Sequence, residues 1–473
     1  MLQFVGRPQE PPAKRGARQR RADFREIYEE LPAAAAEQQA GRCSQCGIPF
    51  CQIHCPLQNN IPDWLKLTAE GRLKEAYELS QATNAMPEVC GRICPQDRLC
   101  EANCVLETSQ HGTVTIGAIE RHLTDMAWRE GWVEPLAPRR LLNQSVGIIG
   151  AGPAGLTAAE ELRRRGYRVT VYDRHDRAGG LLIYGIPNFK LEKDIVTRRV
   201  KRLADGGVQF ALSFEVGRDA SLDELRARHD SILIAAGAYR PRAMEAPGVR
   251  LAGLVEALDY LIASNRKGLG DDVPEYESGA LDARGKNVVV LGGGDTAMDC
   301  VRTAVRQGAE SVTCLYRRDR DNMPGSLREV SNAEEEGVVF AWQTLPKAFF
   351  GGREVEAVRG VRTRLGVADA GGRRAFEEIR SEDFTLSADL VIKALGFEAE
   401  DFPALFRAHD LALSKYGTLK IDRRMMTNRE GVFAAGDAVR GASLVVWAIR
   451  DGRDAAQAMH AWMASQLQKV AAE

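Results

Sequence analysis

Two stretches of the chain alternate between short apolar runs and helix-forming segments. In the first, the apolar run 146–149 predicts a buried strand, 156–165 predicts a helix and 167–172 predicts a second strand. The second stretch repeats this order over 287–291, 296–306 and 311–316. Strands separated by helical segments are typical of parallel α/β sheets. The pattern therefore predicts two strand–helix–strand units.

A glycine-rich turn joins strand to helix in the first unit. Its glycines have the spacing of a dinucleotide-binding turn: the first allows a tight turn, the second lets the backbone approach a pyrophosphate, and the third lets helix and strand pack closely. The following strand ends in an acid placed to bind a ribose hydroxyl. The candidate residues are Gly150, Gly152, Pro153, Ala154, Gly155 and Asp173.

The second unit has a similar turn but a different strand end. Its second strand runs into two arginines instead of an acid, and arginines accommodate a 2′-phosphate. We therefore expect an NADP(H) site here. The candidate residues are Gly292, Gly294, Asp295, Thr296, Ala297, Arg317 and Arg318.

Three further segments suit a flavin in the first unit. Paired glycines within 176–187 let the backbone pass close to a flat ring, and the apolar run 231–238 predicts a buried strand that contains a glycine. An acid after the run 427–436 is placed to accept a hydrogen bond from a ribityl hydroxyl. A helix predicted over 443–466 directs its N-terminus at the flavin. The candidate residues are Gly180, Leu181, Gly237, Gly436, Asp437, Ser443, Leu444 and Val445.

Eight of the ten cysteines fall between positions 43 and 104. They form two runs, Cys43-x2-Cys46-x4-Cys51-x3-Cys55-Pro and Cys90-x3-Cys94-Pro-x4-Cys100-x3-Cys104, separated by a predicted helix over 61–79. Structural zinc usually shows two close Cys-x-x-Cys pairs, and only one occurs here. A run that closes in Cys-Pro resembles the ferredoxin run, whose fourth cysteine ligates the other cluster. The spacing favours two iron–sulfur clusters over zinc, and the count alone would use all eight cysteines.

Length and charge narrow the function classes. A chain of 473 residues predicts two or three domains, and a formal net charge of −1 gives no general attraction to nucleic acid. No apolar run approaches the roughly 20 residues that span a bilayer, so we expect no membrane segment and a cytoplasmic protein. The basic segment 1–40 is either a solvated tail or an arm that docks on another subunit.

Taken together, the two cysteine runs and the sequences GAGPAG, GGGDTAMD, LYRR and FAAGDA resemble the small (β) subunit family of bacterial NADPH-dependent glutamate synthase over essentially the whole chain. The family is similar to the N-terminal module of dihydropyrimidine dehydrogenase and to subunits of NADH-dependent ferredoxin:NADP oxidoreductase. The resemblance implies an α/β flavoprotein with two Rossmann-like dinucleotide-binding domains, preceded by a helical domain with two 4Fe–4S clusters. The implied domains are 1–140 (iron–sulfur), 141–280 (FAD, first part), 281–395 (NADPH) and 396–473 (FAD, second part).

The resemblance also implies a ligand set. Cys43, Cys46, Cys51 and Cys104 would hold one cluster, and Cys55, Cys94 and Cys100 would hold the other. In the dihydropyrimidine dehydrogenase relative a glutamine completes the second cluster. The equivalent position here is Glu120, which leaves Glu120 or Cys90 as the fourth ligand, with Glu120 favoured by the analogy.

The family further implies a partner. NADPH would be oxidised at FAD, and electrons would pass through the two clusters to a large (α) subunit that carries a three-iron cluster and FMN. There, 2-oxoglutarate and glutamine-derived ammonia become glutamate. The alternatives are the small subunit of another NAD(P)H:ferredoxin-type or bifurcating oxidoreductase, and a redox-sensing or scaffolding protein. Two complete dinucleotide turns argue against the last alternative, and a pyridine-nucleotide half without Cys-x-x-Cys argues against a disulfide mechanism.

Overall fold

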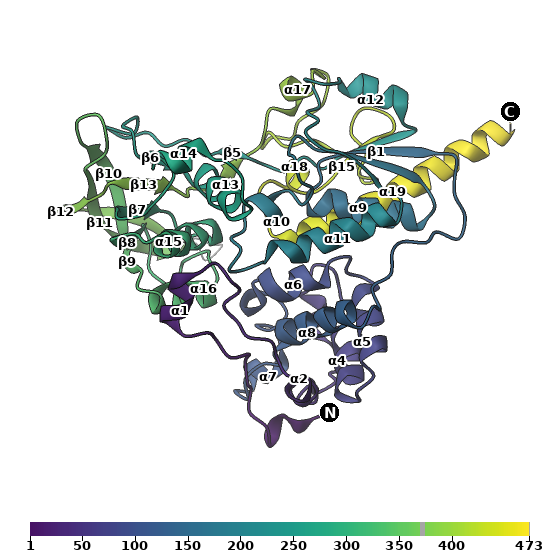
Figure 1. Cartoon of the computed structure of the whole chain (residues 1–473), viewed down its shortest axis with the longest axis horizontal. Helices are drawn as coiled ribbons and strands as arrows, with labels where there is room; N and C mark the ends of the chain where they lie inside the picture. The colour runs from purple at the N-terminus through teal and green to yellow at the C-terminus, as the bar shows by residue number, and fades with distance from the viewer. Residues whose placement is uncertain (369–373, 473) are drawn as a thin grey trace.

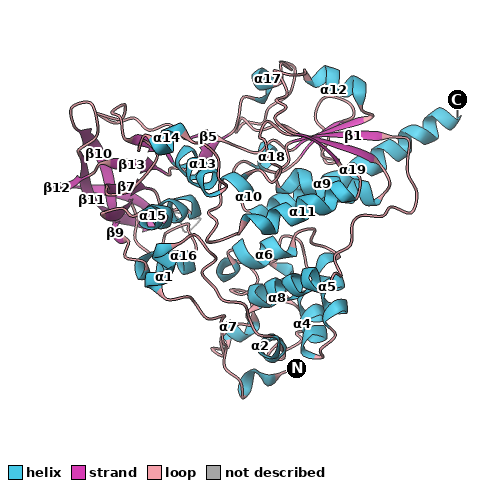
Figure 2. Cartoon of the chain, in the orientation of Figure 1, coloured by secondary structure: helices cyan, strands magenta, loops and turns pink. Residues whose placement is uncertain are grey.

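Two five-stranded parallel sheets, each flanked by helices, lie side by side, and a helical N-terminal domain packs below both of them (Figure 1). The computed structural model describes residues 1–368 and 374–472. Figure 2 shows that the N-terminal domain is built from helices and loops, whereas the strands are confined to the other two regions. No helix in the described residues is long and apolar enough to cross a membrane.

The first sheet has the strand order β15-β4-β1-β2-β3. Its edge strand β15 comes from the end of the chain, where Val432 pairs with Ile232 of β4. The long C-terminal helix packs against α9 so closely that a Cβ on Gly452 would lie 2.1 Å from the Ala154 carbonyl oxygen. The elements here are β1 (Ser145–Ile149), α9 (Pro153–Arg164), β2 (Arg168–Tyr172), α10 (Leu181–Tyr184), α11 (Lys193–Asp205), β3 (Gln209–Ala211), α12 (Leu222–Arg228), β4 (Ser231–Ile234), α17 (Phe402–Leu405), β15 (Val432–Ala434), α18 (Asp437–Arg440) and α19 (Val445–Ala472).

The second sheet has the strand order β6-β13-β7-β8-β9, and a three-stranded antiparallel sheet, β10-β11-β12, extends beside it. Its edge strand β6 precedes the predicted domain boundary at residue 281, so this sheet begins earlier in the chain than we predicted. The elements are β6 (Leu254–Glu256), α13 (Ala257–Gly268), α14 (Pro274–Glu277), β7 (Asn287–Leu291), α15 (Asp295–Gln307), β8 (Ser311–Tyr316), α16 (Leu327–Glu335), β9 (Val339–Trp342), β10 (Thr344–Phe350), β11 (Ala357–Ala368), β12 (Arg374–Ser387) and β13 (Leu390–Lys393). A short ribbon of β5 (Arg240–Pro241) and β14 (Phe397–Glu398) pairs the two chain crossings between the sheets.

The N-terminal domain is a set of short helices around one apolar core. The predicted helix over 61–79 is divided in two, because Gly71 adopts a φ of +73° between α4 and α5. Helix α8 buries Ile119 and Leu123 in this core. The elements are η1 (Gln3–Val5), α1 (Ala17–Ala22), α2 (Ala33–Ala40), α3 (Phe50–Ile53), α4 (Ile61–Ala69), α5 (Leu73–Gln81), α6 (Pro87–Ile93), η2 (Gln96–Arg98), α7 (Val105–Thr108) and α8 (Ile116–Arg129).

The basic N-terminal segment binds within its own chain. Arg20 of α1 is only 2% exposed, and its guanidinium donates to Glu336 at 3.2 Å and to Glu335 at 2.6 Å at the end of α16. Glu336 also accepts hydrogen bonds from Arg302 and Arg306 of α15. We call Arg20, Arg302, Arg306 and Glu336 the Glu336 cluster. This part of the segment is therefore neither a solvated tail nor a free arm.

Candidate functional site

The first glycine-rich turn leaves the carboxyl end of β1, in the middle of the first sheet. Gly150 has a φ of +107°, and a Cβ there would lie 2.3 Å from the Ala235 carbonyl oxygen. A Cβ on Gly155 would lie 1.9 Å from the Gly150 carbonyl oxygen. Both positions therefore require glycine. The turn places the N-terminus of α9 where backbone N–H groups can bind a phosphate.

Asp173 ends β2 next to this turn, as a ribose-binding acid should. Its carboxylate accepts hydrogen bonds from the backbone N–H of Ala151 at 2.7 Å and of His175 at 2.8 Å. The side chain is 8% exposed and lines a cavity beside Gly150. The geometry brings the acid and the glycine turn together on one side of the sheet.

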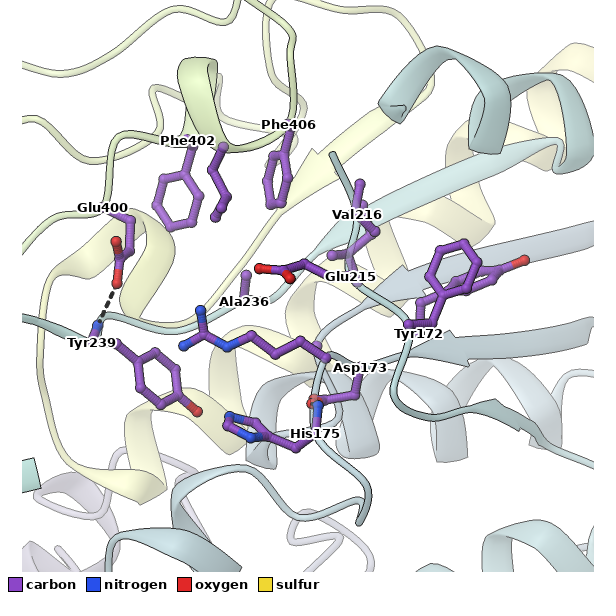
Figure 3. A pocket seen from close by; sticks show the side chains of 15 residues that line it. Tyr172, Asp173, His175, Glu215, Val216, Ala236, Tyr239, Glu400, Phe402 and Phe406 are labelled. Atoms are coloured by element: carbon purple, nitrogen blue, oxygen red, sulfur yellow. Dashed lines mark hydrogen bonds between the residues drawn. The ribbon is translucent and has the colours of Figure 1, made fainter. Parts of the chain in front are cut away.

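The cavity beside Asp173 is closed by residues that we did not predict (Figure 3). Tyr239 lies next to His175, the Arg174 guanidinium sits 4.5 Å from the centre of the Tyr239 ring, and Phe402 and Phe406 form the opposite wall. The Tyr239 backbone N–H donates to Glu400 at 3.1 Å. These residues come from distant segments, so no local pattern marks them. Aromatic and arginine side chains around an acid suit an adenosine group.

Two other predicted segments come close to the same turn. Gly180 has a φ of +53°, and a Cβ on it would lie 2.9 Å from the Gly152 Cα. Gly436 has a φ of +68°, and a Cβ on it would lie 3.0 Å from the Ala154 Cβ. Three chain segments thus approach one another closely around the glycine turn, where the absence of side chains at Gly180 and Gly436 suits the close approach of a dinucleotide.

Asp437 follows Gly436 at the start of α18. Burial raises the pKa of this carboxyl to about 7, and the nearby Ser443 backbone N–H acts in the opposite direction. Helix α19 begins at Val445, two residues later than the predicted start. Gly237, with a φ of +78°, follows β4. The predicted FAD residues therefore gather around the carboxyl ends of β1, β4 and β15.

The second turn repeats this construction in the second sheet. Gly292 has a φ of +140°, and a Cβ on it would lie 2.2 Å from the Ala394 carbonyl oxygen. A Cβ on Gly293 would lie 2.4 Å from the Tyr316 ring. Helix α15 begins at Asp295, so Gly294, Asp295, Thr296 and Ala297 form its first turn.

The two arginines follow β8 beside this turn. Arg317 is exposed and lies over the Phe376 ring, with 5.0 Å between the guanidinium and the ring centre. Arg318 is half-buried, and among the residues that the structure describes its Nε finds no hydrogen-bond acceptor. A buried, unsatisfied guanidinium nitrogen is costly unless a ligand supplies the acceptor, which suits a phosphate.

The eight N-terminal cysteines divide between two cavities. Cys43, Cys46, Cys51 and Cys104 line the first cysteine cavity. The second cysteine cavity is lined by Cys55, Cys90, Cys94, Cys100 and Glu120. Cys55 thus leaves its own run and joins the second group, which is the arrangement expected from the Cys-Pro pattern.

The spacing of these donors bears on which metal they suit. A structural zinc ion needs four ligands within about 2.0–2.3 Å. Over residues 1–368 and 374–472, no three His, Cys, Asp or Glu side chains converge closely enough to hold a single ion. Four thiols around each buried cavity suit a larger, soft metal group, so the donor set fits a 4Fe–4S cluster. Burial raises the pKa of Cys51 to about 12 and that of Cys55 to about 11, so metal binding must displace their protons.

Asn84 also lines the second cysteine cavity and was not predicted. Its Nδ2 donates to Glu120 Oε1 at 3.1 Å, and its Oδ1 lies 3.8 Å from the Cys90 sulfur. Burial raises the pKa of Glu120 to about 8. One buried amide therefore contacts both candidate fourth ligands.

Family models match both parts of the chain. A model described as dihydropyrimidine dehydrogenase domain II, 4Fe-4S cluster, matches residues 20–132. A model described as pyridine nucleotide-disulphide oxidoreductase matches residues 144–452.

Curated relatives match over nearly the whole chain. The glutamate synthase (NADPH) small chain of Azospirillum brasilense is 64% identical over 463 residues, which are 98% of this chain and 96% of the relative. The protein of the same name from Escherichia coli is 45% identical and covers 98% of this chain and 99% of the relative.

Solved structures share the two-sheet fold. Mycobacterium tuberculosis FprA in complex with NADPH has a TM-score of 0.59 at 21% identity and covers 70% of this chain and 86% of that chain. Thioredoxin reductase from Lactococcus lactis has a TM-score of 0.50 at 21% identity, over 68% of this chain and 100% of that chain. At this identity the likeness concerns the fold alone, and it confirms the predicted fold class.

Proposed function

Because this chain belongs to the family of glutamate synthase (NADPH) small chains, we propose that it is the electron-input subunit of a glutamate synthase, joined to a larger chain. It is an NADPH-dependent oxidoreductase with FAD and iron–sulfur cofactors. The larger chain would carry FMN and a three-iron cluster and would form glutamate from glutamine and 2-oxoglutarate. The ten cysteines of the present chain are all free of disulfide bonds, which suits a reducing compartment, so we also infer a cytoplasmic location.

When bound, NADPH would supply a hydride, which carries two electrons. The flavin and the clusters would pass these electrons on one at a time. The chain's own residues position these groups. The turn at Gly150–Gly155 and Asp173 would hold FAD, and the turn at Gly292–Ala297 with Arg317 and Arg318 would hold NADPH. Hydride transfer needs no acid or base, so positioning is the main contribution of the protein.

The observation that carries the proposal is the division of the cysteines of the N-terminal domain between two cavities, the second of which is also lined by Val446 of α19. This domain lies below both sheets (Figure 1). We assign Cys43, Cys46, Cys51 and Cys104 to one cluster. We assign Cys55, Cys94, Cys100 and Glu120 to the other. Cys90 would then remain a thiol.

A native anaerobic purification of this chain tests the proposal. We expect a larger protein to co-purify, with FMN and with glutamine-dependent glutamate formation when NADPH is supplied. The isolated chain should reduce an artificial dye with NADPH but make no glutamate. Co-purification with a ferredoxin-linked protein instead would move the function to an NAD(P)H:ferredoxin-type oxidoreductase, with the same cofactor sites.

A further inference from the structure

The segment 323–328 runs from the loop after β8 into the first turn of α16, and it lies between the second dinucleotide turn and the second cysteine cavity. We call it the linking segment. On one side it covers the turn: the Gly325 backbone N–H donates to the Gly293 carbonyl at 2.9 Å, and the Ser326 backbone N–H donates to Asp295 Oδ1 at 3.0 Å. A dinucleotide bound at this turn must therefore lie next to the linking segment.

On the other side the linking segment binds the iron–sulfur domain. The Ser326 hydroxyl donates to the Asp97 carboxylate at 2.9 Å. Arg328 Nη1 donates to Gln96 Oε1 at 3.0 Å, and its Nη2 donates to Glu101 Oε2 at 3.1 Å. Six residues thus connect the NADP(H) site to the segment 96–101.

Both partners of Arg328 belong to the surroundings of the second cysteine cavity. Gln96 lines it, is 2% exposed and donates through Nε2 to the Cys90 carbonyl at 3.0 Å. Glu101 directly follows Cys100, and its Oε1 accepts the Gly117 backbone N–H at 3.0 Å. Arg328 therefore holds two buried side chains beside the cavity in place.

The charges of Arg328 and Glu101 determine how their contact affects a cluster in the second cysteine cavity. Glu101 is 8% exposed, and it directly follows Cys100 in the chain. One-electron reduction adds a negative charge to a cluster, so an uncompensated carboxylate there opposes reduction. The Arg328 guanidinium offsets that carboxylate.

We propose that Arg328 is a positioning residue that couples the NADP(H) site to the second cluster: it neutralises Glu101, raises the reduction potential of that cluster, and shifts that potential when a dinucleotide occupies the turn. The inference rests on the proposed function, because it requires a cluster in the second cysteine cavity.

A redox titration followed by electron paramagnetic resonance tests the electrostatic part. The full chain is purified anaerobically as wild type, Arg328→Gln, Arg328→Lys, and the distant control Arg359→Gln, which removes an arginine of β11 that pairs with Asp383 of β12. The second cluster is identified as the signal lost in Cys94→Ser. We expect Arg328→Gln to shift its one-electron equilibrium about tenfold toward the oxidised form, or about 59 mV. Arg328→Lys should retain most of the wild-type value, Arg359→Gln should retain all of it, and adding Glu101→Gln to Arg328→Gln should restore it.

The coupling between dinucleotide binding and the potential of the second cluster is tested on the wild-type chain. This measurement also tests the inference if Arg328→Gln loses its cluster. The probe is 2′,5′-ADP, which carries the 2′-phosphate but no nicotinamide. We expect it to shift the potential of the second cluster and not that of the first. The inference would be overturned if 2′,5′-ADP binds without shifting the potential of the second cluster. It would also be overturned if Arg328→Gln with its full cluster content keeps the wild-type potential. Either result would leave the proposed function intact. A wild-type chain without cluster signals would overturn the proposed function as well.

Discussion

Among single residues, Asn84 separates the two candidate ligands of the second cluster. Its amide N–H donates to Glu120 Oε1, so this oxygen is held as the acceptor. Its carbonyl oxygen accepts from the Met86 backbone N–H at 3.0 Å and faces the Cys90 thiol at 3.8 Å. The Asn84 amide thus presents its N–H group to Glu120 and its carbonyl oxygen to Cys90.

Serine substitutions at Cys90 and Cys94 distinguish these roles. We expect Cys94→Ser to remove one cluster and to block electron transfer to the large chain, while NADPH still reduces the flavin. The matched variant Cys90→Ser should retain both clusters. Iron content and paramagnetic resonance measure the result. Loss of a cluster in Cys90→Ser, together with its retention in Glu120→Ala, would instead assign Cys90 as the ligand.

We propose that the arginines at the end of β8, Arg317 and Arg318, set the preference for NADPH. Removing both in Arg317→Ala/Arg318→Ala should raise the KM for NADPH by about 10- to 100-fold, since a charged hydrogen bond contributes roughly 1.5–3 kcal/mol. NADH has no 2′-phosphate, so its KM should change little. Steady-state dye reduction with both nucleotides measures the ratio. An unchanged preference for NADPH would mean that the 2′-phosphate binds elsewhere.

At the scale of elements, the helix that follows each glycine turn depends on close backbone approach. In the first unit α9 comes so near the turn that Gly155 has no room for a Cβ, whereas Gly268 at the end of α13 has no heavy atom within 4 Å of its Cβ position. A glycine-to-alanine substitution adds the same methyl group at both positions, so a difference in stability between the two variants reports how tightly each position is packed.

We expect Gly155→Ala to destabilise the chain by about 1–3 kcal/mol, through overpacking, and to weaken FAD binding. The control Gly268→Ala should be neutral or stabilising by up to about 1 kcal/mol, because alanine is the better helix former. Thermal unfolding and retained flavin absorbance measure both variants. Equal flavin content in the two would show that α9 can move away without loss of the site.

The same elements show what the sequence could predict. Both dinucleotide turns follow from local glycine spacing. The Cys-Pro pattern predicts that Cys55 joins the second group, whereas the place of Cys104 in the first group was implied only by the family resemblance. Gly71 interrupts the predicted helix 61–79 because of its positive φ, which helical periodicity alone does not indicate. Tyr239 and Glu400 meet only when strands far apart in the chain come together, so no local pattern could place them.

In the whole molecule, the Glu336 cluster joins the first helix of the chain to the NADPH-binding sheet. Glu336 is fully buried and accepts from Arg20 at 3.2 Å, Arg302 at 2.9 Å and Arg306 at 2.7 Å. Burial acts to raise the pKa of this carboxyl, but hydrogen bonds from Arg306 and Arg302 outweigh it and lower the pKa to about 2.

Glu336→Gln should therefore destabilise the chain strongly, by about 3–5 kcal/mol, because it removes the buried charge that the Arg20, Arg302 and Arg306 guanidinium groups share. The control Glu378→Gln breaks an exposed pair with Lys347 and should cost less than about 1 kcal/mol. Urea unfolding followed by circular dichroism measures both. Similar values for the two variants would show that the cluster does not hold the domains together.

This stabilisation should also depend on pH. The pKa of a glutamate in the unfolded chain is about 4.3. Because the pKa of Glu336 is lower in the folded chain, its ionised carboxylate stabilises the fold above about pH 4.3, and this stabilisation is lost as the pH falls toward about 2. The difference between wild type and Glu336→Gln should accordingly be full at neutral pH and shrink in acid. A difference that stays constant would contradict the lowered pKa of Glu336.

The position of β15 has a consequence for the order in which the protein matures. Because Val432 pairs with Ile232, the first sheet stays incomplete until β15 has left the ribosome. The first cysteine cavity, lined by residues between 43 and 116, and the second sheet are both complete earlier in synthesis, and domains generally fold as units as they emerge. A cluster can therefore enter the first cysteine cavity before the first sheet is complete, whereas the second cysteine cavity also needs Val446 of α19.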